Sequence, residues 1–174
     1  MAIRAIFAVN KDNIFGRNNK LPWIINADLK RFQHLTTQVK DKQYPKASLP
    51  VVVMGRSTWF SLPGSKRPLK DRINAVLSTD PTLKLQGADV HTSLDSVIEK
   101  YGELHDIWLI GGSKLLQSHM HLVSEIKLTY VENKVDGDVR GPKINFGEWD
   151  VTTGDLQQEG IYKFRYIDLV RKTA

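Results

Sequence analysis

The chain has 174 residues, 41% hydrophobic and 25% charged, which allows one domain with a sizeable core, and no apolar run reaches membrane-spanning length. It has no cysteine, which excludes disulfides, thiolate metal sites and cysteine nucleophiles, so we expect a cytoplasmic protein without a metal site. The net charge of +6 comes from scattered lysines and arginines, a pattern that favours an anionic small-molecule ligand over nucleic acid or a membrane.

The N-terminal segment predicts a buried strand over residues 2–9, since it is mostly apolar and contains β-branched and aromatic residues. The polar segment 10–20 then predicts a loop, with the apolar pair Ile14 and Phe15 at its centre. Such a loop is either a lid beside a pocket or a loop fixed to the core by Phe15, and the residues alone favour neither interpretation.

A helix is predicted over residues 26–39, after a proline and a tryptophan that close the preceding loop. The Asn26 side chain is expected to cap this helix, because its oxygen can accept a hydrogen bond from an N–H of the first turn. An apolar stripe recurs at spacings of three and four residues, formed by Leu29, Phe32, Leu35 and Val39.

Asp28 lies in the first turn of this helix and, at the i,i+4 spacing, on the same face as Phe32. We therefore expect its carboxylate to be partly buried, and a buried carboxylate needs a partner that compensates for the lost hydration. Taken alone, the segment fits an acid that the helix macrodipole favours at a helix start. The interpretation of Asp28 as a pocket residue therefore depends on the rest of the chain.

The middle of the chain alternates between strands and helices, after a polar surface excursion over residues 40–49. The predicted elements are a buried strand over 50–54, a glycine turn and short helix over 55–62, a strand over 72–78 and a weaker strand over 88–91.

The last third begins with a helix that either Ser93 or Thr92 caps and that Gly102 ends. A buried strand over 107–110 then runs through Gly111-Gly112 into another helix. The remaining predicted elements are a strand over 126–131, a turn over 136–138 and an antiparallel pair over 149–153 and 161–170.

This order of elements predicts a single α/β domain over residues 1–174. The central sheet would be mostly parallel, with about eight strands and an antiparallel C-terminal edge, and about four helices would flank it.

Two of the predicted strands end in glycine turns that open helices, at Gly55 and at Gly111-Gly112. Glycine lets the backbone approach a ligand, and free N–H groups at a helix start favour anions. Arg56 and Lys114 add positive charge at these turns, and hydroxyl donors come from Ser57, Thr58 and Ser113. A single such turn is usually only a strand–helix junction, but two turns in one sheet suit a ligand with separated phosphates, such as a dinucleotide.

The chain resembles the dihydrofolate reductase family in an ordered set of segments that spans nearly its whole length. The matching segments are Ala8-Val9, Ile14-Phe15-Gly16, Leu21-Pro22-Trp23, Ala27-Asp28-Leu29 with Phe32, Val53-Met54-Gly55-Arg56-Ser57-Thr58-Trp59, Arg67-Pro68-Leu69, Arg72-Ile73-Asn74, Leu77-Ser78, Ile110-Gly111-Gly112, Leu128-Thr129 and Gly137-Asp138. The resemblance implies a monomeric enzyme of one-carbon and thymidylate metabolism, and a target of antifolates. It would reduce 7,8-dihydrofolate with NADPH, by hydride transfer to C6 and solvent-assisted protonation of N5.

The resemblance also implies roles at the pterin. Asp28 would accept hydrogen bonds from the pterin edge, and Thr129 would bond both Asp28 and the pterin amino group. Trp23 would position a water near Asp28, and Leu21 would lie on the active-site loop.

Further substrate contacts are implied in the same way. The aminobenzoyl ring would lie between Phe32, Leu62 and Leu69, although for Leu62 core packing is the better interpretation from the sequence alone. Arg72 would form a bidentate pair with the α-carboxylate of the glutamate tail, although a surface role at the strand edge is the commoner one for such an arginine. The remaining implied substrate-site residues are Ile6, Leu29 and Ile110.

For the cofactor, the resemblance implies an NADPH site formed by both glycine turns, the first strand and its loop. The implied residues are Ala8, Phe15, Gly16, Asn19, Gly55, Arg56, Ser57, Thr58, Leu77, Ser78, Thr79, Gly111, Gly112, Ser113, Lys114 and Leu115. Ser78 and Thr79 would lie where the 2′-phosphate of the adenosine is held. The bond between Gly111 and Gly112 would be cis, and Asp138 would tether the active-site loop.

Two features depart from the family pattern. Leu116 occupies a position where many members have an aromatic residue near the nicotinamide, and the connection over 40–49 is longer than in the most compact members. Two other functions remain open: a reductase of the same fold for another pterin or a pyrimidine intermediate, and a basic binding protein without activity. The pairing of Trp23 with Asp28 argues against the first, and salt-sensitive nucleic-acid binding without NADPH affinity would indicate the second.

Overall fold

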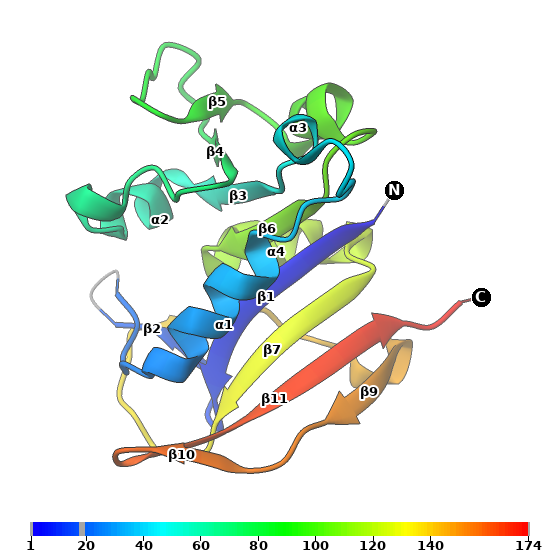
Figure 1. The fold of residues 1–174 in the computed structure, drawn as a ribbon. Helices are drawn as coiled ribbons and strands as arrows, with labels where there is room; N and C mark the ends of the chain where they lie inside the picture. Colours follow the sequence, from blue (N-terminus) through cyan, green and yellow to red (C-terminus); the bar gives the residue numbers. More distant parts are fainter. Residues whose placement is uncertain (1, 18–19, 174) are drawn as a thin grey trace.

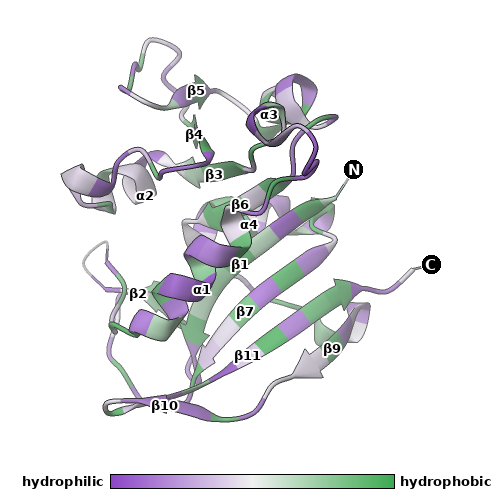
Figure 2. Ribbon diagram, viewed as in Figure 1, coloured by the Kyte–Doolittle hydropathy of each residue, from purple (hydrophilic) through white to green (hydrophobic). Residues whose placement is uncertain are grey.

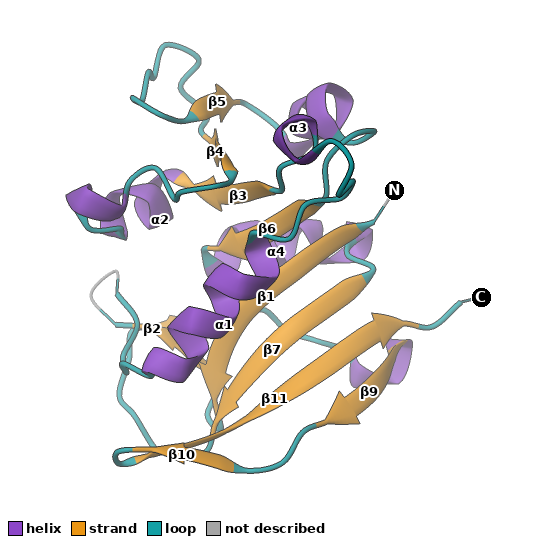
Figure 3. Ribbon diagram, viewed as in Figure 1, coloured by secondary structure: helices purple, strands orange, loops and turns teal. Residues whose placement is uncertain are grey.

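A computed structural model describes residues 2–17 and 20–173 of the chain. In these ranges the helices are α1 (Asn26–Thr36), α2 (Arg56–Ser61), α3 (Leu94–Tyr101) and α4 (Ser113–His119). The strands are β1 (Ile3–Asn10), β2 (Ile14–Gly16), β3 (Val51–Gly55), β4 (Ile73–Leu77), β5 (Asp89–His91), β6 (Ile107–Gly111), β7 (Glu125–Val131), β8 (Val139–Arg140), β9 (Trp149–Thr153), β10 (Gln157–Glu159) and β11 (Tyr162–Arg171). Figure 3 shows most of the strands gathered into one large twisted sheet.

Nine of the described strands form this sheet. Neighbouring strands are parallel from β5 through β4, β3, β6 and β1 to β7, whereas β11 pairs antiparallel with β7, β10 and β9 (Figure 1). The predicted mostly parallel sheet with an antiparallel C-terminal edge is therefore confirmed. Because the parallel strands share one direction, Gly55, Leu77 and Gly111 all lie at the same edge of the sheet.

Helices cover both faces of the sheet because its central strands are apolar on both sides. In β1, Phe7 and Val9 pack on the face that α3 and α4 cover, whereas Ile6 and Ala8 pack on the face of α1 and α2. Figure 2 shows hydrophobic residues along the central strands and hydrophilic residues on the outer side of α1. No helix among the described residues has the length and apolar composition that a bilayer crossing requires.

The segment after β1 differs from the predicted loop, because residues 14–16 form β2 and pair with β8. Gly137 makes the close approach possible, since a Cβ there would lie 2.3 Å from Ile14 Cγ2 and 2.6 Å from the Gly16 oxygen. The loop prediction is therefore wrong at β2. The neighbouring residues could not indicate this strand, because its partner β8 lies more than a hundred residues away in the sequence. Phe15 packs against Phe7, with ring centroids 6.2 Å apart, which supports the interpretation of a segment fixed to the core.

Helix α1 begins at Asn26, the first residue of the predicted range, but its cap and its C-terminal end differ from the prediction. Ile25 occupies the capping position, so Asn26 is already helical and the prediction that its side chain caps the helix is wrong. The helix ends at Thr36 rather than at residue 39, where the hydroxyls of Thr36 and Thr37 donate to carbonyl oxygens of the preceding turn. In α3, by contrast, Ser93 accepts from the Ser96 N–H and is the cap, one of the two predicted candidates.

Candidate active site

Asp28 lies in the first turn of α1, half-buried, with its side chain directed at β7. The Thr129 hydroxyl donates to Asp28 Oδ1 at 2.6 Å, across 101 residues of sequence. Burial raises the pKa of the Asp28 carboxyl above its ordinary value, an effect larger than the opposing ones of the Thr129 hydrogen bond and the Arg31 charge. The arrangement leaves a poorly hydrated carboxylate with an oxygen available for a ligand that offers N–H donors.

Behind Asp28 the site is closed by residues before α1 and by β1. Trp23 is only 2% exposed, and its indole N–H has no hydrogen-bond acceptor among the described residues. Ala8 lies opposite Thr129 in the pairing of β1 with β7, so both residues form the same part of the wall. Leu21, two residues before Trp23, is 48% exposed.

An apolar cluster continues from this pocket toward α2. It joins Ile6 to partly buried side chains of α1, of β6 and of the segment between α2 and β4, namely Phe32, Ile110, Leu62 and Leu69. All five were predicted for the substrate site, and the structure brings them together. Leu29 is outside this cluster and 45% exposed.

Arg72 lies at the far end of the same cluster, just before β4. Its guanidinium donates through Nη1 to Thr36 Oγ1 at 3.1 Å and through Nε to the Lys70 oxygen at 2.8 Å, and lies over the Phe32 ring. Burial lowers the pKa of Arg72, more than the nearby Asp71 raises it. A guanidinium so oriented and partly desolvated suits a carboxylate ligand.

The two glycine turns face each other at the edge of the sheet. A Cβ at Gly55 would lie 3.9 Å from the Gly112 nitrogen, and a Cβ at either Gly111 or Gly112 would lie 3.6 Å from Thr58 Oγ1. Gly111 has a φ of +132°, which L side chains rarely adopt, and its bond to Gly112 is cis, as the resemblance implied. A Cβ at Gly111 would also lie 3.5 Å from Phe15 Cζ, so the Phe15 ring borders this turn.

Charged and hydroxyl groups surround these turns. Arg56, Ser57 and Lys114 are exposed, whereas the Ser113 hydroxyl donates to the Arg140 oxygen at 2.5 Å. Leu115 is partly buried against the core, and Gly16 is buried in β2 beside Val139.

The end of β4 forms the third part of this edge. Leu77 pairs with His91 of β5, and the Ser78 N–H donates to the His91 oxygen at 2.9 Å. The Ser78 hydroxyl oxygen accepts from the Asp80 N–H at 3.1 Å, and Thr79 is exposed. Asn19, also predicted for the cofactor, lies outside the described residues.

Two residues of the site region were missed by sequence reasoning. Thr36 orients Arg72, and Glu159 of β10 accepts hydrogen bonds from the first two N–H groups of α1. Neither contact has a local sequence signal, because each joins residues that are distant in the chain.

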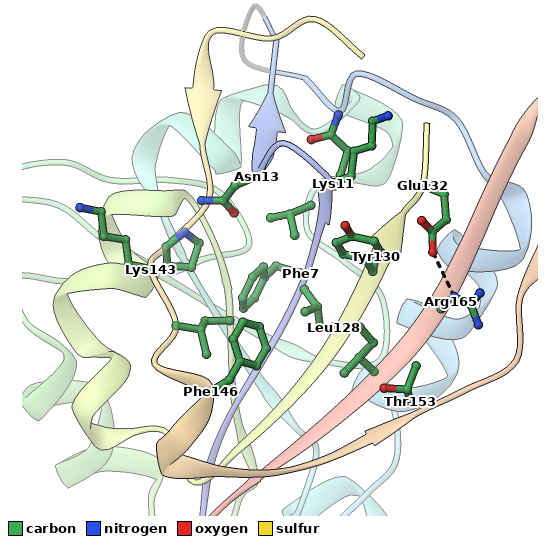
Figure 4. A pocket seen from close by; sticks show the side chains of 15 residues that line it. Phe7, Lys11, Asn13, Leu128, Tyr130, Glu132, Lys143, Phe146, Thr153 and Arg165 are labelled. Carbon is green, nitrogen blue, oxygen red and sulfur yellow. Dashed lines mark hydrogen bonds and ion pairs between the residues drawn. The ribbon is translucent and has the colours of Figure 1, made fainter. Parts of the chain in front are cut away.

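A cavity of about 530 Å³ lies on the opposite face of the sheet from Asp28, between β1, β7, β11 and the segment 142–146 (Figure 4). Its lining is mostly apolar, with Phe7, Leu128 and Phe146 prominent, and its carboxylate Glu132 is paired with Arg165. Figure 4 shows the Lys143 side chain directed away from the centre of the cavity. Because this cavity lies on the other face of the sheet from Asp28 and its carboxylate is already paired with Arg165, we take the Asp28 pocket as the candidate site.

Comparison with known proteins points to one family. The family model described as dihydrofolate reductase matches residues 2–171. The dihydrofolate reductase of Sus scrofa is 33% identical over 182 residues, which cover 94% of this chain and 95% of that protein. That of Haemophilus influenzae is 29% identical over 99% of this chain and 100% of its own length. The solved dihydrofolate reductase from Enterococcus faecalis, complexed with NADP(H) and RAB-propyl, has the same fold, with a TM-score of 0.81 at 23% identity, over 99% of this chain and 97% of that one.

Proposed function

Because the chain belongs to the dihydrofolate reductase family and is an NADPH-dependent oxidoreductase, we propose that it reduces 7,8-dihydrofolate to 5,6,7,8-tetrahydrofolate. The observation that carries the proposal is the half-buried Asp28 carboxylate, held by Thr129 beside an apolar cluster that ends at Arg72. This series offers a carboxylate for the pterin, an apolar wall for the ring and a guanidinium for the glutamate tail.

In the proposed reaction, Asp28 holds the pterin by accepting from its ring N–H and its exocyclic amino group side by side. Thr129 keeps the carboxylate in this orientation through its 2.6 Å hydrogen bond. The indole N–H of Trp23, buried without an acceptor in the described part of the chain, suits a water that also reaches Asp28. The proton for N5 comes from solvent, while Asp28 acts on the pterin through its charge.

The residues at the edge of the sheet fit NADPH. The lack of side chains at Gly55, Gly111 and Gly112 lets a ligand approach the backbone, and the exposed Arg56 and Lys114 would bring positive charge to the phosphates. When bound, NADPH supplies the hydride for C6, so that one NADPH and one proton are consumed for each dihydrofolate. Phe15 and Ala8 would border the nicotinamide, and Ser78 and Thr79 the adenosine phosphate.

The rest of the substrate would extend from Asp28 along the apolar cluster. Phe32, Leu62 and Leu69 would contact the aminobenzoyl ring, and Arg72 would bind the α-carboxylate in a bidentate pair. Thr36 would hold the guanidinium in the required orientation.

A direct test is to mix the purified protein with NADPH and dihydrofolate and to follow the NADPH absorbance. We expect consumption of NADPH that requires dihydrofolate, and much slower consumption when other pterins or pyrimidine intermediates replace it. Folded protein that consumes NADPH no faster than a reaction without enzyme would contradict the proposal.

A further inference from the structure

The N-terminus of α1 is held by a residue from the opposite end of the chain. The N–H of Asn26 donates to Glu159 Oε2 at 2.6 Å, and the N–H of Ala27 donates to Glu159 Oε1 at 3.0 Å. Each oxygen accepts one of the two bonds, so the carboxylate binds both N–H groups as a fork. Hydrogen bonds to an ionised acceptor are about twice as strong as neutral ones.

This contact replaces an ordinary helix cap. Ile25 stands in the capping position and has no side-chain acceptor, so the first N–H groups of the helix need partners from elsewhere. Glu159 provides an acceptor for two of them and brings negative charge to the positive end of the helix dipole. The position of the N-terminus of α1 therefore depends on a residue of the sheet and not only on the helix itself.

The turn that Glu159 holds is the turn that carries Asp28. Asp28 follows Ala27 directly, and its own N–H donates to the Ile25 oxygen at 3.1 Å. The backbone of this turn is thus fixed by Glu159, while the side chain of Asp28 is fixed by Thr129.

Both fixing residues belong to one ladder of paired strands. Glu159 pairs with Tyr162 at the start of β11, and further along the same strand Tyr166 pairs with Thr129 of β7. Burial raises the pKa of the Tyr166 hydroxyl most, and the charge of Asp28 raises it further. The charge of Arg31 lowers this pKa, and that of Glu159 raises it by the smallest amount. Glu159 and Thr129 therefore belong to the same set of paired strands and both contact the first turn of α1.

We propose that Glu159 is a positioning residue of the active site, which holds the first turn of α1 to the strands that carry Thr129 and so keeps the Asp28 carboxylate where it meets the pterin. The proposal rests on the proposed function, since it assumes that Asp28 binds a pterin. Glu159 acts through the helix and has no contact with the reacting atoms.

The first experiment compares the Kd values of folate and NADPH, measured by quenching of tryptophan fluorescence. Glu159→Ala should raise the Kd of folate about fivefold, the factor expected for loss of a helix cap, and change that of NADPH less than twofold. Glu159→Gln keeps one acceptor oxygen and should recover part of the loss. Gln157→Ala, on the same strand with an exposed side chain, should leave both Kd values unchanged.

A second variant tests the route through the helix without touching Glu159. Asn26→Pro removes one of the two donors, and proline is accepted at the first helical position after an extended residue such as Ile25. We expect it to raise the Kd of folate about twofold in the wild-type background and to have no effect in the Glu159→Ala background. Fully additive effects in the double variant would overturn the proposed route.

A third measurement needs no substrate. Titration of the Asp28 carboxyl by NMR should give a lower pKa in Glu159→Ala than in Glu159→Gln. Both variants lack the Glu159 charge, but only alanine removes every acceptor, and a looser first turn lets water reach the carboxyl whose burial raises that pKa. The charged or titratable groups that interact with Asp28 are Arg31 on its own helix and Tyr166 on β11; Arg31 in turn pairs with Asp168 of β11, and Glu159 of β10 acts on Tyr166.

The outcomes separate the two proposals. Absence of dihydrofolate turnover in the wild-type protein contradicts the proposed function, whereas the NMR titration still tests the positioning. Equal pKa values of Asp28 in Glu159→Ala and Glu159→Gln, or equal weakening of folate and NADPH binding, would show that Glu159 serves only general stability and would overturn the positioning role.

Discussion

The two sides of the proposed active site use different chemical groups. On the proposed pterin side, Asp28, Thr129 and Arg72 present side chains that are partly or fully buried and hydrogen-bonded to distant residues. On the proposed phosphate side, Gly55 and Gly111-Gly112 present backbone without side chains, with exposed cations around it.

Because of this difference, we expect the two sides to respond to different kinds of substitution. The pterin side depends on single hydrogen bonds between elements that fold together, so one side-chain change alters chemistry there without changing the backbone. The phosphate side depends on backbone shape and on the lack of Cβ atoms, so added side-chain atoms matter more than lost charges. Variants on one side should therefore leave ligand binding at the other side largely intact.

The largest effect is expected for Asp28→Asn, which keeps an oxygen for the Thr129 hydroxyl but removes the charge. Turnover of dihydrofolate near neutral pH should fall about 100- to 1000-fold, a usual loss when a positioned charged group is removed from an active site. The Kd of NADPH should change less than twofold. Asp95→Asn, in the first turn of α3, is the matched control, and unchanged turnover in Asp28→Asn would remove Asp28 from the reaction.

Arg72→Lys should have the next largest effect, confined to ligands with a glutamate tail. Lysine cannot form the bidentate pair, so the Kd of dihydrofolate should rise about 10- to 100-fold, the range for hydrogen bonds to charged groups. A pterin without the tail should bind equally to both proteins. Equal losses for the two ligands would show that Arg72 supports the pocket and does not bind the tail.

On the phosphate side, Gly111→Ala and Gly112→Ala form a matched pair. Both would place a Cβ at 3.6 Å from Thr58 Oγ1, but only Gly111 has a φ that strains an alanine, at +132° against −77° for Gly112. Thermal unfolding should show a loss of about 1–3 kcal/mol for Gly111→Ala and less than about 0.5 kcal/mol for Gly112→Ala. Equal destabilisation by Gly111→Ala and Gly112→Ala would mean that the contact with Thr58, and not the positive φ, requires glycine at position 111.

The smallest expected effect is on stability, and it has the opposite sign to the effect on activity. Because burial raises the pKa of Asp28, the folded protein holds that proton more tightly than the unfolded chain does. The stabilisation is present at low pH and is lost as the pH rises from the ordinary value through the raised pKa. Asp28→Asn should therefore raise the Tm of the ligand-free protein slightly at neutral pH, and the difference should shrink as the pH falls. A lower Tm for Asp28→Asn than for the wild-type protein at neutral pH would contradict the inference that burying the charged Asp28 carboxylate destabilises the folded protein.

Much of the fold was predictable because its signals are local. The apolar runs at β3 and β6 and the Ser93 cap of α3 need only neighbouring residues to be recognised, and each matches the structure. β2 and β10 were not predicted, since short strands become strands only when a partner strand lies alongside.

For the active site, the sequence by itself determined the chemical groups: an acid in a first helical turn, two glycine turns at strand ends, and the family pattern that joins them. Tertiary structure alone decided two of the partners. Thr36 for Arg72 and Glu159 in place of the expected Asn26 cap are separated from the groups they hold by 36 and more than 130 residues. Thr129, 101 residues from Asp28, was indicated as its partner only by the family pattern and not by any local rule. Local rules concern residues within one helical turn or one strand pairing, so they show which groups need a partner, and only the folded chain brings a distant partner within hydrogen-bond distance.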